Sequence, residues 1–177
     1  MKKSMPWIRC AGFLVGLAVI LGICDFCFAP SGYVRFILHE VNRKDTQYDT
    51  IILGASHARS AINPEYLDEE LGTNTLNLAI PGETVKDAYY LLKDACESND
   101  VKTVIMDVDY QYWMDEQPQG YFTEPFICQN ITNLKVKTEY LLDNWDTIDL
   151  RNVLVRRLSW DCTWSSVKQN ISTKMTE

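Results

Sequence analysis

The chain has 177 residues, of which 46% are hydrophobic and 23% charged, and this composition is typical of one folded domain with an appended segment. Its formal net charge is -7, and the part that follows the first thirty residues carries 14 basic and 23 acidic side chains. An acidic surface repels phosphate backbones, so the composition argues against nucleic-acid binding. The two histidines and six cysteines form no zinc pattern, and we expect neither a metal nor another cofactor.

The cysteines do not form a disulfide scaffold. Three of the six lie in the apolar N-terminal stretch, and the other three, Cys96, Cys128 and Cys162, follow it. Because three is an odd number, at least one of these thiols stays free within a monomer. Their spacing neither pairs them nor indicates an oligomeric state.

The first thirty residues are a targeting segment. Basic residues precede an uncharged apolar run from Cys10 to Cys24, and the stretch from Trp7 to Ala29 is long enough to cross a bilayer. No small-x-small cleavage site is evident, and bulky Ile23 precedes Cys24 where a lipoprotein signal has a small residue. We therefore expect residues 1–30 to be an uncleaved signal anchor with its basic end cytoplasmic and the rest extracytoplasmic. The alternatives are a cleaved signal peptide and a buried helix of the folded domain.

Residues 31–47 are expected to form a polar juxtamembrane link, and residues 48–177 to form the folded α/β domain. A short buried strand is predicted over 48–54 and ends in glycine. A helix should follow it. Pro64 suits its first position, and Gly72 can end it. The residues of its apolar face are Tyr66, Leu67 and Leu71.

Two more strands and a strongly patterned helix follow. Strands are predicted over 75–80 and 102–108, and the second of these is apolar enough to be covered on both faces. Between them, apolar residues recur at helical spacing from Val85 to Cys96, and Thr84 with Asp87 makes a capping pair. Alternating strands and helices predict a parallel sheet wrapped by crossover helices.

The pattern loosens beyond the third strand. Residues 110–126 are predicted to form an aromatic, turn-rich loop. A further helix is predicted from Asp146, and its apolar residues are Ile148, Leu150, Val153, Leu154 and Leu158. No fourth strand is predicted.

Reactive groups in a parallel sheet belong at the carboxyl ends of the strands, and three loops qualify, at 54–58, 80–84 and 107–113. Ser56 lies in a tight strand-to-helix turn, which suits a nucleophile. Gly82 directly precedes the strong helix, where its N–H can approach an anion closely. The simpler interpretation is that Ser56 caps a helix and Gly82 only turns the chain.

These residues resemble a family. Gly54-Ala55-Ser56-His57, after a strand that begins at Tyr48, resembles the first block of the SGNH (GDSL-type) hydrolases, in whose membrane-anchored bacterial branches G-x-S-H replaces G-D-S-L. The run from Asn77 to Thr84 resembles the second block, N-x-x-I-x-G-(D/E)-T, at the expected spacing. The third block, G-x-N-D, is matched in outline, with Gln111 at the asparagine position.

The resemblance implies a three-layer α/β/α, flavodoxin-like fold and an acyl esterase or acyltransferase that acts on acyl groups of cell-surface polysaccharides. Ser56 would be the nucleophile. The oxyanion hole would be formed by the N–H groups of Ser56 and Gly82 and by the side-chain amide of Gln111, with His57 and Asn77 in supporting positions.

The chain departs from the family because it lacks the motif that supplies the catalytic base. The family takes its base and orienting acid from a D-x-x-H block near the end of the domain, and nothing after the second block here resembles it. The histidines are His39, upstream of the first strand, and His57, beside the serine. We therefore expect an N-terminal portion or a truncated product that is nearly inactive alone. An in-frame or frameshifted D-x-x-H past codon 177 of the gene would decide this.

Two other functions are compatible with the sequence. The domain is alternatively a non-catalytic, membrane-tethered module that binds an envelope glycan or a partner protein through the aromatic loop at 110–126. Asp107-Val108-Asp109 also has the form of the metal-binding D-x-D of a nucleotide-sugar transferase, although no nucleotide-binding feature accompanies it.

Overall fold

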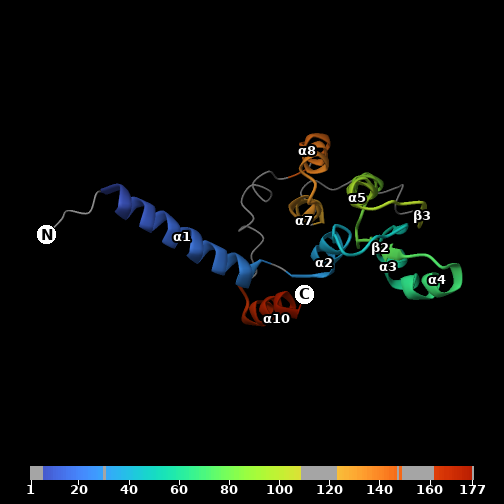
Figure 1. Ribbon diagram of the computed structural model, residues 1–177, viewed down its shortest axis with the longest axis horizontal. Coiled ribbons are helices and arrows are strands. Elements are labelled where there is room, and N and C mark those ends of the chain that lie inside the picture. Colours follow the sequence, from blue (N-terminus) through green and yellow to red (C-terminus); the bar gives the residue numbers. More distant parts are fainter. Residues whose placement is uncertain (1–5, 30, 109–122, 147, 149–161, 177) are drawn as a thin grey trace. The chain divides into compact units, whose positions relative to one another are not determined.

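The computed structural model describes residues 6–29, 31–108, 123–146, 148 and 162–176 (Figure 1). The chain divides into two compact units. One comprises Met1–Gly32 with Val155–Glu177, and the other comprises Tyr33–Leu154.

The first unit contains helix α1 (Pro6–Phe28) and helix α10 (Trp164–Thr176), which contact each other. Within α1, the 22 residues from Trp7 to Phe28 have a mean hydropathy of 2.3 and are long enough to cross a membrane, and the most apolar stretch is 0% buried. The prediction of a continuous apolar helix is confirmed. A membrane span and a signal sequence both have these properties.

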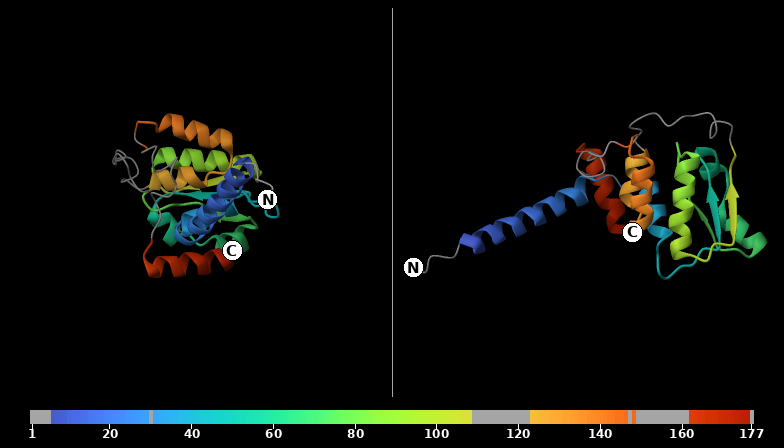
Figure 2. Two further views of the ribbon diagram at one scale, coloured as in Figure 1. Left: turned by 90° about the vertical axis from the view of Figure 1, so that its left-hand side faces the viewer. Right: turned by 90° about the horizontal axis from the view of Figure 1, so that it is seen from above.

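The second unit is built on a parallel sheet of three strands in the order β2-β1-β3, so the parallel sheet is confirmed (Figure 2). The strands are β1 (Thr50–Leu53), β2 (Thr75–Asn77) and β3 (Thr103–Met106). Thr50 of β1 pairs with Thr75 on one side and Thr103 on the other. β2 is shorter than predicted, but Leu78 N and Ile80 N continue the ladder by donating to the carbonyls of Ile52 and Gly54.

Helices cover both faces of the sheet. Ile51 and Leu53 point to a core shared with α2 (Tyr33–Glu40), α5 (Val85–Ser98), α7 (Thr123–Asn130) and α8 (Leu134–Asp143). Ile52 points to the other face and packs with α3 (Ser56–Ala61) and α4 (Pro64–Leu71). The alternation follows from the two-residue period of a strand. Large side chains of the first core outside the sheet are Ile37, Leu38, Leu91, Ile127 and Tyr140.

Two helices begin as predicted, and one of them, α4, also ends as predicted. Thr84 and Asp87 form a complete capping box on α5, because each side chain bonds the backbone N–H of the other residue. α4 begins at Pro64 after the N-cap Asn63 and ends at Gly72, whose φ of 66° is left-handed. The apolar face expected on α4 is not buried as a whole. Tyr66 and Leu71 are exposed, and Leu67 packs against the sheet.

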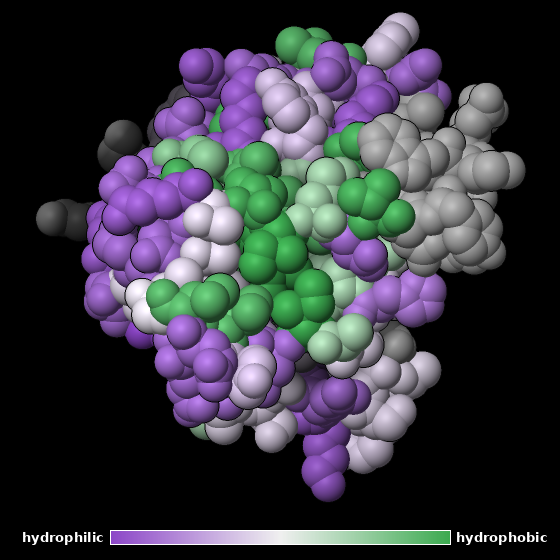
Figure 3. Space-filling view, turned by 90° about the vertical axis from the view of Figure 1, so that its right-hand side faces the viewer, coloured by the Kyte–Doolittle hydropathy of each residue, from purple (hydrophilic) through white to green (hydrophobic). Residues whose placement is uncertain are grey.

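The prediction that the third strand is covered on both faces is wrong. The register places Val104 and Met106 of β3 on the same face as Ile51 and Leu53, yet they are 42% and 37% exposed. α5 packs over β1 on this face, and among the described elements none pairs with the outer edge of β3. Figure 3, viewed from the side on which β3 lies, shows a stripe of hydrophobic residues there.

The segment expected to be a polar link contains a core helix. α2 lies within it, and its Ile37 and Leu38 are buried. Just beyond the helix, Asn99 Nδ2 donates to the carbonyl of Val41 at 2.7 Å, and Tyr48 N donates to Asn99 Oδ1 at 3.0 Å. Residues 33–48 therefore belong to the folded unit. The helix predicted from Asp146 lies mostly outside the described residues.

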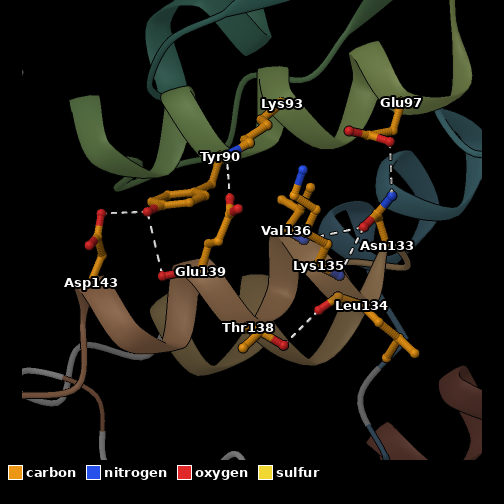
Figure 4. A network of polar contacts seen from close by, with 10 residues as sticks. All are labelled: Tyr90, Lys93, Glu97, Asn133, Leu134, Lys135, Val136, Thr138, Glu139 and Asp143. Carbon is orange, nitrogen blue, oxygen red and sulfur yellow. Dashed lines mark hydrogen bonds and ion pairs between the residues drawn. The ribbon is translucent and has the colours of Figure 1, made fainter.

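Polar contacts join α5 to α8 (Figure 4). Lys93 pairs with Glu139, and the Tyr90 hydroxyl donates to Asp143. Asn133 caps α8 by accepting from the N–H groups at 135 and 136, and its amide donates to Glu97. α8 was not predicted, because its few buried residues leave no clear apolar face.

The buried carboxyl of Asp94 should make stability depend on pH. Asp94 accepts from Asn42 Nδ2 at 2.9 Å and from Asn133 N at 3.2 Å, and burial raises its pKa despite these bonds. A raised pKa means that the folded state holds this proton more tightly. The contribution therefore favours folding below the carboxyl's ordinary pKa and is lost as pH rises through the raised value. Relative to Asp94→Asn, the wild type should gain thermal stability as pH falls from about 7 towards about 4. A melting-temperature difference that stays constant over this range would contradict the prediction.

Candidate functional site

The candidate site lies at the carboxyl edge of the sheet. β1 ends at Leu53 and continues into the turn that carries Ser56, and the β2 segment continues to Gly82. β3 continues to Asp107, whose N–H donates to the carbonyl of Leu53 at 3.0 Å. Because the strands are parallel, these three turns follow the same edge, which is where open α/β sheets bind their ligands.

Gly54 shapes the turn that presents Ser56. Its φ is +148°, and a Cβ atom built there would lie 2.7 Å from Ala58 Cβ and 2.8 Å from Asp107 Cβ. The missing side chain therefore lets α3 and the end of β3 approach each other. The N-cap of α3 is Ala55, so the interpretation of Ser56 as the helix cap is wrong. Ser56 is the first residue of α3 and is exposed.

Asn77 connects β2 to α3. Its Nδ2 donates to the carbonyls of Ala58 and Ile62, both at 3.2 Å, and its Oδ1 accepts from Ala79 N at 3.1 Å. The first two acceptors lie within and just after α3, and the Ala58 carbonyl also accepts from Ile62 N at 3.2 Å. Asn77 thus holds the short helix that carries Ser56 and His57.

Gly82 lies in a tight turn before α5. Glu83 N donates to the carbonyl of Ile80 at 2.9 Å, Pro81 precedes the glycine, and Gly82 has a φ of +77°. This is the sequence signature of a type II turn. The buried carboxylate of Glu83 accepts from Ile80 N at 2.9 Å and steadies the turn. Gly82 itself is exposed, and the use of its N–H as an oxyanion donor stays a prediction.

Two residues near this edge were not found by sequence reasoning. The Tyr33 hydroxyl donates to the carbonyl of Asn77 at 2.9 Å, and the Arg59 guanidinium lies 4.5 Å from the centre of the Tyr33 ring. Burial raises the pKa of Tyr33, an effect that Arg59 opposes and Glu83 strengthens. Arg59 follows Ser56 by three residues, a spacing that places both on one face of α3. That spacing is a local signal for Arg59, whereas no local signal connects Tyr33 to the site.

The remaining predicted residues fall in different places. His57 is exposed and directly follows Ser56 on α3, and consecutive helical side chains point about 100° apart. His39 is exposed in the last turn of α2. Gln111 and Asp109 lie outside the described residues, as do residues 110–122 of the predicted aromatic loop. Residues 123–126, predicted as the end of that loop, instead form the start of α7.

The chemistry available at this edge is that of a serine hydroxyl, backbone N–H groups and a cation. Over the described ranges, no group of three His, Cys, Asp or Glu side chains is placed to hold a metal ion. All six cysteines are free thiols, with Cys128 buried and with Cys96 and Cys162 exposed. Comparisons of the chain with protein-family models, with curated proteins and with solved structures found no match.

Proposed function

We propose that the chain carries the nucleophile and the backbone oxyanion donors of a membrane-anchored, extracytoplasmic acyl esterase or acyltransferase of the SGNH type. The proposed substrates are acyl groups on cell-surface polysaccharides. The observation that supports it best is the parallel order β2-β1-β3, because it brings the Ser56 turn and the Gly82 turn to one edge of the sheet. Helices on both faces agree with the three-layer, flavodoxin-like arrangement of that family.

The proposed reaction is acyl transfer through a covalent serine intermediate. Ser56 Oγ attacks the ester carbonyl, and the N–H groups of Ser56 and Gly82 stabilise the oxyanion that forms. The C–O bond to the alcohol then breaks, and the alcohol leaves with a proton. Water accepts the acyl group from Ser56 in an esterase, and a glycan hydroxyl accepts it in a transferase.

This reaction also needs a base for the Ser56 proton. A base must come within about 2.6 to 3.2 Å of the hydroxyl. His57 is badly placed for this, because it is adjacent to Ser56 on the same short helix. With oxyanion donors and no base, a serine enzyme keeps roughly 10³- to 10⁴-fold acceleration over water. We therefore propose that the chain alone turns over slowly.

The proposed location is the extracytoplasmic face of the cell membrane, with α1 as an uncleaved anchor. The support is the length of the apolar helix, its 0% burial and the basic residues that precede it.

Hydrolysis of p-nitrophenyl acetate by the full chain in detergent micelles tests the assignment of Ser56. We expect slow acetate release that Ser56→Ala reduces to the buffer rate, with an acetyl adduct on the Ser56 peptide of the wild type by mass spectrometry. Ser60→Ala is the matched control, because Ser60 is an exposed serine on the same helix, and its rate should not change.

Turnover that is unchanged in Ser56→Ala would remove Ser56 from the mechanism. Fast turnover that is lost in both Ser56→Ala and His57→Ala would show that His57 acts as the base, against the geometry of α3.

A further inference from the structure

Helix α10 carries an apolar stripe that is only partly covered. Four apolar residues at spacings of three and four fall on one face of this helix: Trp164, Val167, Ile171 and Met175. Val167 and Ile171 are half-buried, whereas Trp164 is 82% and Met175 is 76% exposed. Lys168 is exposed beside the stripe. The exposed residues Ser165, Gln169 and Ser172 form a polar side of the helix, on which Gln169 points farthest from Trp164.

The same helix lies beside the C-terminal end of α1 (Figure 1). A buried asparagine makes the main polar contact between them. Asn170 is only 4% exposed. Its Oδ1 accepts from Ser31 N at 2.9 Å and from Ser31 Oγ at 3.0 Å, and its Nδ2 donates to the carbonyl of Cys27 at 3.3 Å. These contacts join residues that lie far apart in the chain.

A lysine of α10 completes this contact. Lys174 Nζ donates to the carbonyls of Phe26 at 2.8 Å and Ala29 at 2.5 Å, and it lies 5.6 Å from the centre of the Phe26 ring. The last carbonyls of a helix have no partner within that helix, and a cation is favourable at that end of the helix dipole. Lys174 and Asn170 together cap α1.

We propose that α10 is an interfacial helix that lies in the phospholipid headgroup layer where α1 leaves the membrane, with Trp164 and Met175 inserted towards the acyl chains. This inference rests on the proposed anchoring role of α1. If α1 spans the bilayer, its C-terminal end lies at the membrane surface, and a helix that caps this end is held at the same depth.

The exposed residues of α10 suit a position in the phospholipid headgroup layer. Tryptophan is enriched at the membrane interface because its ring is apolar and its N–H is polar. A helix with an apolar stripe, a polar opposite face and nearby lysines binds in the plane of the interface. The apolar window of α1 is 0% buried, so under the proposed anchoring its side chains face lipid, and α10 contacts this same helix. Lys168 is exposed and can reach lipid phosphates along the edge of the stripe.

The buried contacts also favour an α1 that stays attached. Cleavage after α1 would remove the Cys27 carbonyl that Asn170 binds and the Phe26 carbonyl that Lys174 binds. A buried polar group that loses its partner destabilises the folded state.

Tryptophan fluorescence of the full chain in vesicles tests the position of α10. The chain is reconstituted into phosphatidylcholine and phosphatidylglycerol vesicles with the other four tryptophans changed to phenylalanine, so that Trp164 alone reports. The control variant combines Trp164→Phe with Gln169→Trp, which moves the probe to the polar face of the same helix. We expect a blue-shifted emission and strong quenching by lipids brominated near the headgroup for Trp164, and a water-like, weakly quenched emission for the control. Asn170→Ala should weaken the quenching of Trp164, because it loosens α10 from α1.

Resistance to alkaline carbonate extraction, measured on the same vesicles, separates this inference from the proposed anchor. A chain that resists extraction but has water-exposed Trp164 overturns the interfacial helix and leaves the anchor standing. Equal quenching of Trp164 and the control also overturns it. A chain that carbonate extracts, or whose first thirty residues are absent, overturns the anchor and the interfacial helix together.

Discussion

Replacing Gly54 by alanine should destabilise the sheet domain by roughly 3 kcal/mol or more, the largest effect we expect from a single added methyl group in this chain. The new Cβ would lie within 3 Å of Ala58 Cβ and Asp107 Cβ. Both are atoms fixed to the backbone, so α3 or the end of β3 would have to move. The φ of +148° adds backbone strain for any residue with a side chain.

Urea unfolding of the full chain in detergent micelles, followed by circular dichroism, measures this loss. Gly72→Ala is the matched control, because Gly72 also has a positive φ of 66° but has no atom within 4 Å of the added Cβ. Backbone strain alone should lower the free energy of unfolding of Gly72→Ala by about 1 kcal/mol. Equal losses for the two variants would show that the close approach at Gly54 is unimportant.

Truncating Asp87 should cost about 3 kcal/mol, because one carboxylate serves both the start of α5 and its packing against α8. Asp87 is 1% exposed. It accepts from Thr84 N at 3.0 Å and from the buried Tyr140 hydroxyl at 2.6 Å. Asp87→Ala removes the capping box and leaves the Tyr140 hydroxyl with one partner fewer in the core.

Tyr140→Phe is the companion variant, because it removes one hydrogen bond and keeps the capping box. It should cost about 1 kcal/mol. The double variant should lose less free energy of unfolding than the sum of the two single changes, because both remove the same contact. Strict additivity in urea unfolding would contradict the direct coupling of α5 to α8 through this bond.

The elements that could be predicted are those whose signals are local. The capping box of α5 and the ends of α4 at Pro64 and Gly72 depend on neighbouring residues, and the structure has them as expected. The burial of β3 could not be predicted, because an apolar strand does not show which elements cover it. α2 was missed because it is only eight residues long, too short for its apolar residues to show a clear helical period between the anchor segment and the polar residues that follow.

The same division applies to the candidate site. The glycines and Ser56 were found because strand-end turns have a local sequence pattern. Tyr33 was missed because its contact with the Asn77 carbonyl joins positions 44 residues apart, which no short motif records.

The strand order also bears on how the domain folds. The central strand is the first to be synthesised, and each neighbour reaches it only after a loop has closed. Thr75 follows its partner Thr50 by 25 residues, whereas Thr103 follows it by 53. Each doubling of loop length costs about 0.6 kcal/mol in closure entropy. β1 and β2 should therefore pair first, with α3 and α4 folding between them. β3 should join later, by pairing with the edge of β1 that β2 leaves open.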